Sequence, residues 1–210
     1  MTEKTMTKIK ICGITNISDV LAASELGADA IGFIFAKSPR KVTATKVKKI
    51  VKRLPPFIFK VGVFVDEKAS TVNRIIKECN LDFVQLHGSE SPSYCKRITA
   101  PVIKAFRMKD RASLKQISKY NVLAFLLDTY EKEMSGGTGK VFNWNLAKAA
   151  KRFGRPIILS GGLNPNNVAR AIKKVRPYAV DVGSGVEAYP GKKSIRKLKS
   201  FIYKVKSLNN

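Results

Sequence analysis

Short apolar runs alternate along the chain with longer segments in which apolar residues recur every three or four positions. The short runs are rich in β-branched residues, and several lack polar alternation, which is typical of parallel strands covered by helices. We predict eight strands, at residues 8–12, 30–35, 59–65, 83–87, 101–107, 123–128, 156–160 and 179–183. We predict eight helices, each after one strand, at about residues 18–26, 44–53, 69–79, 91–98, 110–119, 144–153, 165–175 and 192–206.

This alternation predicts a single (β/α)8 barrel, the TIM barrel of the α/β class. At about 26 residues per unit, the chain is near the lower end of that fold's size. An open doubly wound sheet is the alternative, but six strands are its usual number. Because no linker rich in proline, glycine or serine interrupts the alternation, we expect one domain over residues 1–210, with residues 1–7 as a flexible N-terminal extension.

The chain carries a large excess of positive charge. Forty lysines and arginines against 15 acids give a formal net charge of +25, and residues 30–65 contain no acid. Such an excess suits nucleic acid, an anionic membrane or an anionic substrate. The lysines mostly occupy the polar faces of amphipathic helices, as in TKVKKIVKRL at residues 45–54, and no known nucleic-acid-binding motif accompanies them. We therefore expect an anionic small molecule as partner and no nucleic acid.

Three cysteines without CxxC spacing suit a reduced compartment and indicate neither a disulfide framework nor a zinc site. No apolar run resembles a signal region or approaches the roughly 20 residues of a membrane span, so we expect a cytoplasmic chain with no membrane partner. Cys79 and Cys95 lie in predicted helices, and we interpret them as structural. Cys12 ends the first strand, where it is either a buried packing residue or a catalytic group at the mouth of the barrel.

Polar residues also stand near the ends of other strands, on the face where barrels carry their active sites. Asp128 follows the apolar run AFLL, so it is either a turn residue or a general acid or base. His87, the only histidine, is either an acid–base group or a donor to an anionic substrate group. The longest connection, residues 129–143, follows the sixth strand on this face. The further candidates here are Arg40, Gln85, Lys104 and Arg107.

Two glycine-rich loops follow the seventh and eighth strands, in the sequences LSGGL and DVGSGVE. Barrels that act on phosphate esters commonly bind the phosphate at these two loops. Gly161, Gly162, Gly183 and Gly185 permit the close approach of backbone N–H groups to an anion. A thiol and a carboxyl group on opposite sides of a sugar phosphate suit proton shuttling, which predicts an isomerase.

Five motifs resemble those of the phosphoribosylanthranilate isomerase family: KICGIT, VQLHG, LLDT, LSGGLNPNNV and VDVGSGVEAYPGKK. The similarity extends from Lys8 to the last helix. It implies a step of tryptophan biosynthesis, the Amadori rearrangement of N-(5-phosphoribosyl)anthranilate to 1-(2-carboxyphenylamino)-1-deoxyribulose 5-phosphate. The resemblance implies no metal and no organic cofactor, because the nitrogen of the substrate acts as the electron sink.

The resemblance also implies roles for individual residues. Cys12 would be the general base and Asp128 the general acid. The substrate-binding residues would be Arg40 and His87, near the anthranilate carboxylate, with Gln85 and the buried acid Asp181. Phosphate would be held by Gly161, Gly162, Gly183, Ser184 and Gly185.

The chain departs from the family pattern at Gly183, where serine is common, and at Asn143, where aspartate is common before a helix. Two other functions compete with this reading. A related histidine-pathway isomerase performs the same chemistry on a substrate with two phosphates, but it uses an aspartate where this chain has Cys12. A basic nucleic-acid-binding barrel rests on charge alone. The sequence leaves the choice between monomer and homodimer open.

Overall fold

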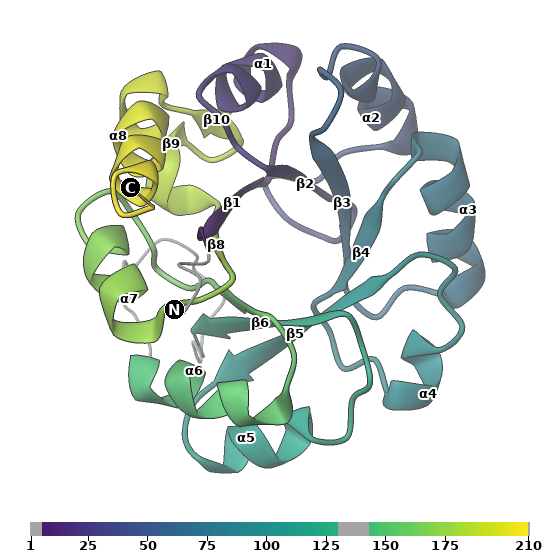
Figure 1. Cartoon of the computed structure of the whole chain (residues 1–210). Coiled ribbons are helices and arrows are strands. Elements are labelled where there is room, and N and C mark those ends of the chain that lie inside the picture. The colour runs from purple at the N-terminus through teal and green to yellow at the C-terminus, as the bar shows by residue number, and fades with distance from the viewer. Residues whose placement is uncertain (1–5, 130–142, 210) are drawn as a thin grey trace.

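The computed structural model of the chain describes residues 6–129 and 143–209. Eight parallel strands close into a barrel in sequence order, with helices around its outside (Figure 1). The prediction of a (β/α)8 barrel is therefore confirmed. The strands are β1 (Lys8–Cys12), β2 (Ala30–Ile34), β3 (Phe59–Phe64), β4 (Phe83–Leu86), β5 (Val102–Met108), β6 (Ala124–Thr129), β7 (Ile157–Leu159) and β8 (Ala179–Val182).

Each strand is followed along the chain by a helix. The helices are α1 (Ile17–Glu25), α2 (Ala44–Val51), α3 (Ala69–Cys79), α4 (Pro92–Cys95), α5 (Ala112–Ile117), α6 (Trp144–Ala150), α7 (Val168–Val175) and α8 (Ile195–Lys206). Most begin at a polar cap, and Asn143 accepts a hydrogen bond from Asn145 N, as expected at the start of α6. None of the described helices is long and apolar enough to cross a membrane.

The structure corrects two predicted helices. The helix expected over residues 91–98 is one turn, α4. The helix expected from residue 192 begins later, because a small hairpin of β9 (Glu187–Tyr189) and β10 (Lys192–Lys193) precedes it. Lys193 N donates to the Asp19 carboxylate, and this long-range bond keeps the segment in the hairpin. Two 3-10 turns, η1 (Lys151–Phe153) and η2 (Ser184–Val186), complete the described elements.

Side chains alternate between the inside of the barrel and the layer between strands and helices. A small apolar cluster fills the inside, and a much larger one lies between strands and helices. The inner cluster includes Phe83, Ile103, Ala124 and Ala179. Alternate positions on the same strands therefore direct His87, Arg107, Asp128 and Asp181 inward.

The described part of the N-terminal segment begins at Met6. Thr7 is buried, its N–H donates to Asn209 Oδ1 at 2.9 Å, and its hydroxyl donates to the Pro177 carbonyl. Thr7 thus belongs to the barrel and contacts the residues after α8. The remainder of the predicted extension, residues 1–5, lies outside the described residues, as does most of the long connection after β6, residues 130–142.

Candidate active site

Cys12 lies at the C-terminal end of β1, buried and facing the inside of the barrel. Its ladder partner is Gly32 on β2, and a Cβ at Gly32 would lie only 2.8 Å from the Cys12 sulfur. Arg40 covers Gly13 beside it, because a Cβ on Gly13 would lie 2.7 Å from Arg40 Cδ. Burial raises the pKa of the Cys12 thiol, and the nearby Lys10 ammonium is the strongest opposing influence.

Asp128, His87 and Gln85 form a hydrogen-bonded row across the mouth. His87 Nε2 lies 3.2 Å from Asp128 Oδ2, and Gln85 Nε2 lies 2.9 Å from His87 Nδ1. An amide nitrogen only donates, so Nδ1 is the acceptor in the bond with Gln85, and Nε2 is the ring nitrogen that faces Asp128. Thr129 N donates to the other carboxylate oxygen at 2.7 Å. Arg107, the ladder partner of Asp128, is exposed beside it.

Asp181 lies deeper in the barrel and forms a buried ion pair. Lys10 Nζ is 2.7 Å from Asp181 Oδ1, and Ser160 donates to the second carboxylate oxygen at 3.1 Å. The side chains of Lys10 and Asp181 are only 3% and 7% exposed. Sequence reasoning missed Lys10, although it stands two residues before Cys12 and strand alternation directs both to the same side.

Arg40 is held by an acid that sequence reasoning also missed. Its guanidinium donates to Glu187 from Nε at 2.8 Å and from Nη2 at 2.6 Å, a bidentate pair. Burial alone would raise the pKa of Glu187, but the hydrogen bonds and charges of Arg40 and Lys193 outweigh it and hold the pKa below its usual value.

Lys193 also bonds Glu187, the partner of Arg40. Its fully buried ammonium donates to the carbonyls of Cys12 at 2.7 Å and Gly183 at 2.9 Å, and to Glu187 Oε1 at 3.1 Å. Lys193 therefore connects the ends of β1 and β8 and, through Glu187, the Arg40 side chain. In the sequence, its place at the end of the motif VDVGSGVEAYPGKK is the signal that sets Lys193 apart from the many exposed lysines.

The glycines of the loops after β7 and β8 differ in backbone conformation and in the space around them. Gly161 and Gly162 have φ of +80° and +63°, a region that L side chains rarely adopt. Neither N–H is hydrogen-bonded to another residue that the structure describes, so both donors are available to an anion. At Gly185 a Cβ would collide with the Leu163 carbonyl, whereas at Gly183 it would meet only the Cys12 carbonyl at 3.8 Å. Ser184 is exposed between these two glycines.

One predicted candidate is outside the site. Lys104 lies between inward-facing Ile103 and Ala105, so it points behind the barrel wall, where its Nζ is 3.1 Å from Glu90 Oε2. All the other predicted site residues are at the mouth or, in the case of Asp181 and Gln85, directly below it. Within residues 6–129 and 143–209, no group of three His, Cys, Asp or Glu side chains has the arrangement of a metal site.

Comparison with known proteins decides the family. The family model for N-(5'-phosphoribosyl)anthranilate (PRA) isomerase matches residues 9–204. The chain belongs to this isomerase family. Curated N-(5'-phosphoribosyl)anthranilate isomerases from Geotalea uraniireducens and Geobacter sulfurreducens are 52% and 51% identical to it, over 97% and 96% of the chain and 100% and 99% of their own lengths.

Solved structures agree. The phosphoribosyl anthranilate isomerase from Thermotoga maritima is 44% identical with a TM-score of 0.91, covering 96% of this chain and all of its own. A phosphoribosyl anthranilate isomerase in complex with reduced 1-(o-carboxyphenylamino)-1-deoxyribulose 5-phosphate is 42% identical with a TM-score of 0.88, at the same coverage. The function of the chain is therefore that of a phosphoribosylanthranilate isomerase of tryptophan biosynthesis, acting on an anionic phosphoribosyl substrate.

Proposed function

We propose that Cys12 and Asp128 perform the acid–base chemistry of this isomerisation. Asp128 gives its proton to the furanose ring oxygen while the C1–O bond breaks and the anilino nitrogen forms a C=N bond to C1. The Cys12 thiolate then removes the proton from C2, whose electrons form the C1=C2 bond and neutralise the iminium nitrogen. The resulting enolamine tautomerises to the ketone, so no atom is gained or lost. The observation that carries this proposal is that the thiol and the carboxyl group stand on β1 and β6, on opposite sides of one mouth.

The neighbours of Asp128 support its role as the acid. His87 Nε2 faces one carboxylate oxygen, so the imidazole and the carboxyl group can share and transfer a proton. Gln85 orients the ring from behind. In this proposal Arg40 and His87 also receive the anthranilate carboxylate. Two nitrogens of the Arg40 guanidinium are bonded to Glu187, which fixes the direction in which the third is presented.

The phosphate is assigned to the loops after β7 and β8. Available N–H groups at Gly161 and Gly162 support this assignment, together with the close packing at Gly185 that brings the two loops together. Ser184 supplies a hydroxyl at the same end. Asp181 is a positioning residue in this proposal, because Lys10 and Ser160 already occupy both of its carboxylate oxygens.

Substitution of the acid and the base tests the proposal. We expect Cys12→Ser and Asp128→Asn each to lower kcat by at least 10² to 10⁴-fold, the usual contribution of general acid–base catalysis. The assay follows the loss of the anthranilate fluorescence of the substrate. Product affinity, measured by fluorescence on the inactive variants, is expected to persist, since the carboxylate and phosphate contacts remain.

Cys79→Ser is the matched control. Cys79 is buried in α3, away from the mouth, and its hydroxyl replacement is expected to lower stability while kcat stays the same. A Cys12→Ser enzyme whose turnover is within about tenfold of the parent's would remove the thiol from the mechanism.

The face of the barrel opposite the mouth favours a homodimer. Large apolar side chains are exposed at the N-terminal ends of four strands, at Met6, Phe57, Phe59, Leu123 and Tyr178. Phe57 is 97% exposed and has φ of +68°, an unfavourable conformation for a bulky residue. The isomerase of Thermotoga maritima is described as dimeric in a crystal structure of monomers generated from it. That structure has 40% sequence identity to this chain and a TM-score of 0.87.

Light scattering during gel filtration tests this assembly. The parent chain is expected to have the mass of a dimer, and Phe57→Lys the mass of a monomer, because a charge on this face opposes apolar contact. A monomeric parent chain would contradict the assignment without affecting the catalytic proposal.

A further inference from the structure

The environment of Cys12 contains a buried cation that the acid–base scheme does not use. Lys10 and Cys12 are two residues apart on β1 and share the inner side of the strand. A Cβ at Gly32 would lie 3.1 Å from Lys10 Nζ and 2.8 Å from the Cys12 sulfur, so the ammonium and the thiol both lie directly over this glycine. The positive charge of Lys10 lowers the pKa of the Cys12 thiol, and the thiolate in turn raises the pKa of Lys10.

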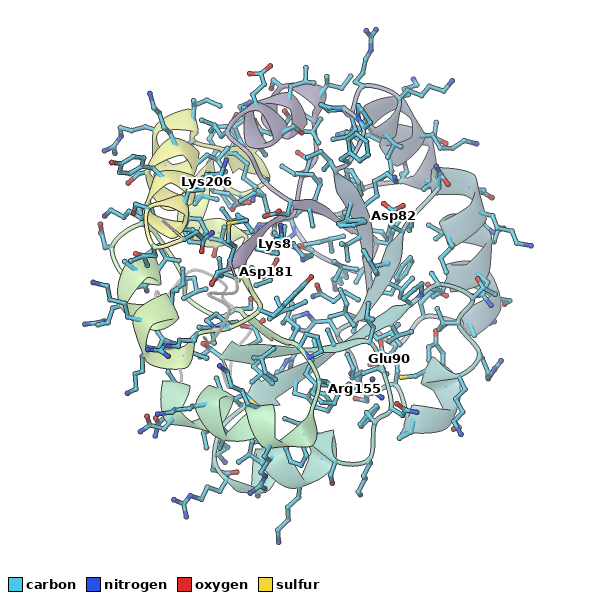
Figure 2. All side chains as sticks on the ribbon, viewed as in Figure 1. Lys8, Asp82, Glu90, Arg155, Asp181 and Lys206 are labelled. Atoms are coloured by element: carbon cyan, nitrogen blue, oxygen red, sulfur yellow. The ribbon has the colours of Figure 1, made fainter. Side chains whose placement is uncertain are left out.

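Asp181 fixes the Lys10 ammonium in this place. The 2.7 Å pair is buried on both sides, and Ser160 holds the other carboxylate oxygen (Figure 2 labels Asp181 within the ring of strands). Burial alone would lower the pKa of Lys10, but the charges of Asp181 and Cys12 outweigh it, so the pKa is raised and the side chain stays protonated.

We propose that Lys10 is a positioning residue that stabilises the thiolate form of Cys12, and that Gly32 supplies the space for their contact. The proposal rests on the assignment of Cys12 as the base. A buried thiol ionises with difficulty, because burial disfavours the charged form. A buried ammonium beside the sulfur offsets that cost. A side chain at Gly32 would separate the two groups or displace both.

Four other charged groups surround the thiol. Asp181 on β8 opposes its ionisation, and Lys193 on β10 favours it. Lys193 contacts the Cys12 carbonyl rather than the sulfur, and Glu187 neutralises it. Arg40, from the loop after β2, is paired with the same Glu187. Lys10 is thus the cation that acts on the sulfur directly, and it exerts the strongest influence in favour of ionisation.

Alkylation by iodoacetamide, measured against pH, reports the ionisation of Cys12 without reference to catalysis. The Cys12→Ser variant provides the background from Cys79 and Cys95. Lys10→Met is expected to lower the thiolate fraction at neutral pH at least about tenfold, one unit of pKa. Asp181→Asn is expected to change it in the opposite direction, because Lys10 then has the thiolate as its counterion. Opposite signs from two halves of one ion pair cannot result from a general loss of structure.

Two further variants keep the test decisive. Lys10→Met with Asp181→Asn removes both charges of the pair and leaves no uncompensated buried ion. Because Asp181 no longer opposes the thiolate, the ionisation of Cys12 in this double variant is expected to lie between those of Lys10→Met and the parent. Lys104→Met removes a lysine that is equally buried but far from the thiol, and it should leave Cys12 ionisation unchanged. Unchanged ionisation of Cys12 in folded Lys10→Met or in the double variant would overturn the proposal.

The pH profile of kcat/KM separates this inference from the assignment of the base. If both hold, the limb that reports Cys12 moves to higher pH in Lys10→Met by the same amount as the alkylation profile. If alkylation shifts and the activity profile does not, Lys10 acts on the thiol as proposed, but Cys12 is not the base.

Discussion

Two buried lysine–carboxylate pairs lie on opposite sides of the barrel wall. Lys10 and Asp181 pair inside the ring of strands, whereas Lys104 and Glu90 pair outside it. Figure 2 labels the two acids, Asp181 and Glu90. The burial of the two pairs is nearly the same, since both lysine side chains are 3% exposed. Ion pairs of equal burial can therefore have different functions, according to which side of a strand they occupy.

The partners of each lysine show the difference. Lys104 Nζ donates to the carbonyls of Leu86, Gly88 and Ala105 as well as to Glu90, so all its bonds join the loop after β4 to β5. Lys10 bonds Asp181 and faces a reactive sulfur. The outer ammonium is enclosed by acceptors of the fold, whereas the inner one, in our proposal, also acts on a thiol that changes its charge during the reaction.

Substitution of the outer lysine gives the largest expected effect on stability. Lys104→Met leaves the Glu90 carboxylate buried without its cation, so we expect the free energy of unfolding to fall by about 3–5 kcal/mol. Urea unfolding measures this change. Because the hydrogen bonds of Lys104 go to Glu90 and to backbone carbonyls, and to none of the proposed catalytic side chains, kcat is expected to stay the same below the unfolding transition. Glu90→Gln added to Lys104→Met should recover part of the loss. A lower kcat at unchanged stability would place Lys104 in the site after all.

The fold could be predicted because its signal is local and repeated. Each predicted strand overlaps its observed counterpart, since an apolar β-branched run needs only its own residues to be recognised. The start of α8 has a local signal that the prediction passed over, the N-cap Ser194, whose hydroxyl accepts from Lys197 N. The hairpin of β9 and β10 is harder to predict, because Lys193 N bonds Asp19, far away in the sequence. Long-range bonds of this kind leave no periodic pattern.

The site was predictable only where a residue ends a strand. Cys12, Asp128 and His87 stand at such positions, and the structure brings them to one mouth. Lys10 and Glu187 lie within the motifs KICGIT and VDVGSGVEAYPGKK, but their roles were missed because their partners, Asp181 and Arg40, lie more than a hundred residues away in the sequence. Lys104 was misplaced by one position of alternation, which moves a side chain to the other side of the wall.

Two glycines beside Cys12, Gly32 on β2 and Gly183 directly after β8, sharpen the comparison on a smaller scale. A Cβ at Gly32 would contact both Lys10 and Cys12, whereas at Gly183 it would meet only one carbonyl at an ordinary distance. Gly183 has φ of −113°, which other residues also adopt. Gly183→Ser is therefore expected to fold and to change KM by less than about tenfold, or ~1.4 kcal/mol. A hundredfold rise in KM would show that the phosphate loop requires glycine here.

The smallest expected effect concerns the exposed charges, which belong to neither of these buried pairs. Most of the +25 net charge is on exposed lysines and arginines, which salt screens, whereas the two buried pairs are screened much less. If the exposed charge serves to attract the anionic substrate, kcat/KM falls a few-fold as ionic strength rises, and kcat changes little. Steady-state rates at increasing concentrations of potassium chloride measure both constants. A kcat/KM independent of salt would show that the surface charge does not attract the substrate. Nucleic-acid binding would then be the remaining role for this charge, and fluorescence anisotropy with a labelled oligonucleotide at near-physiological salt tests it. We expect no binding.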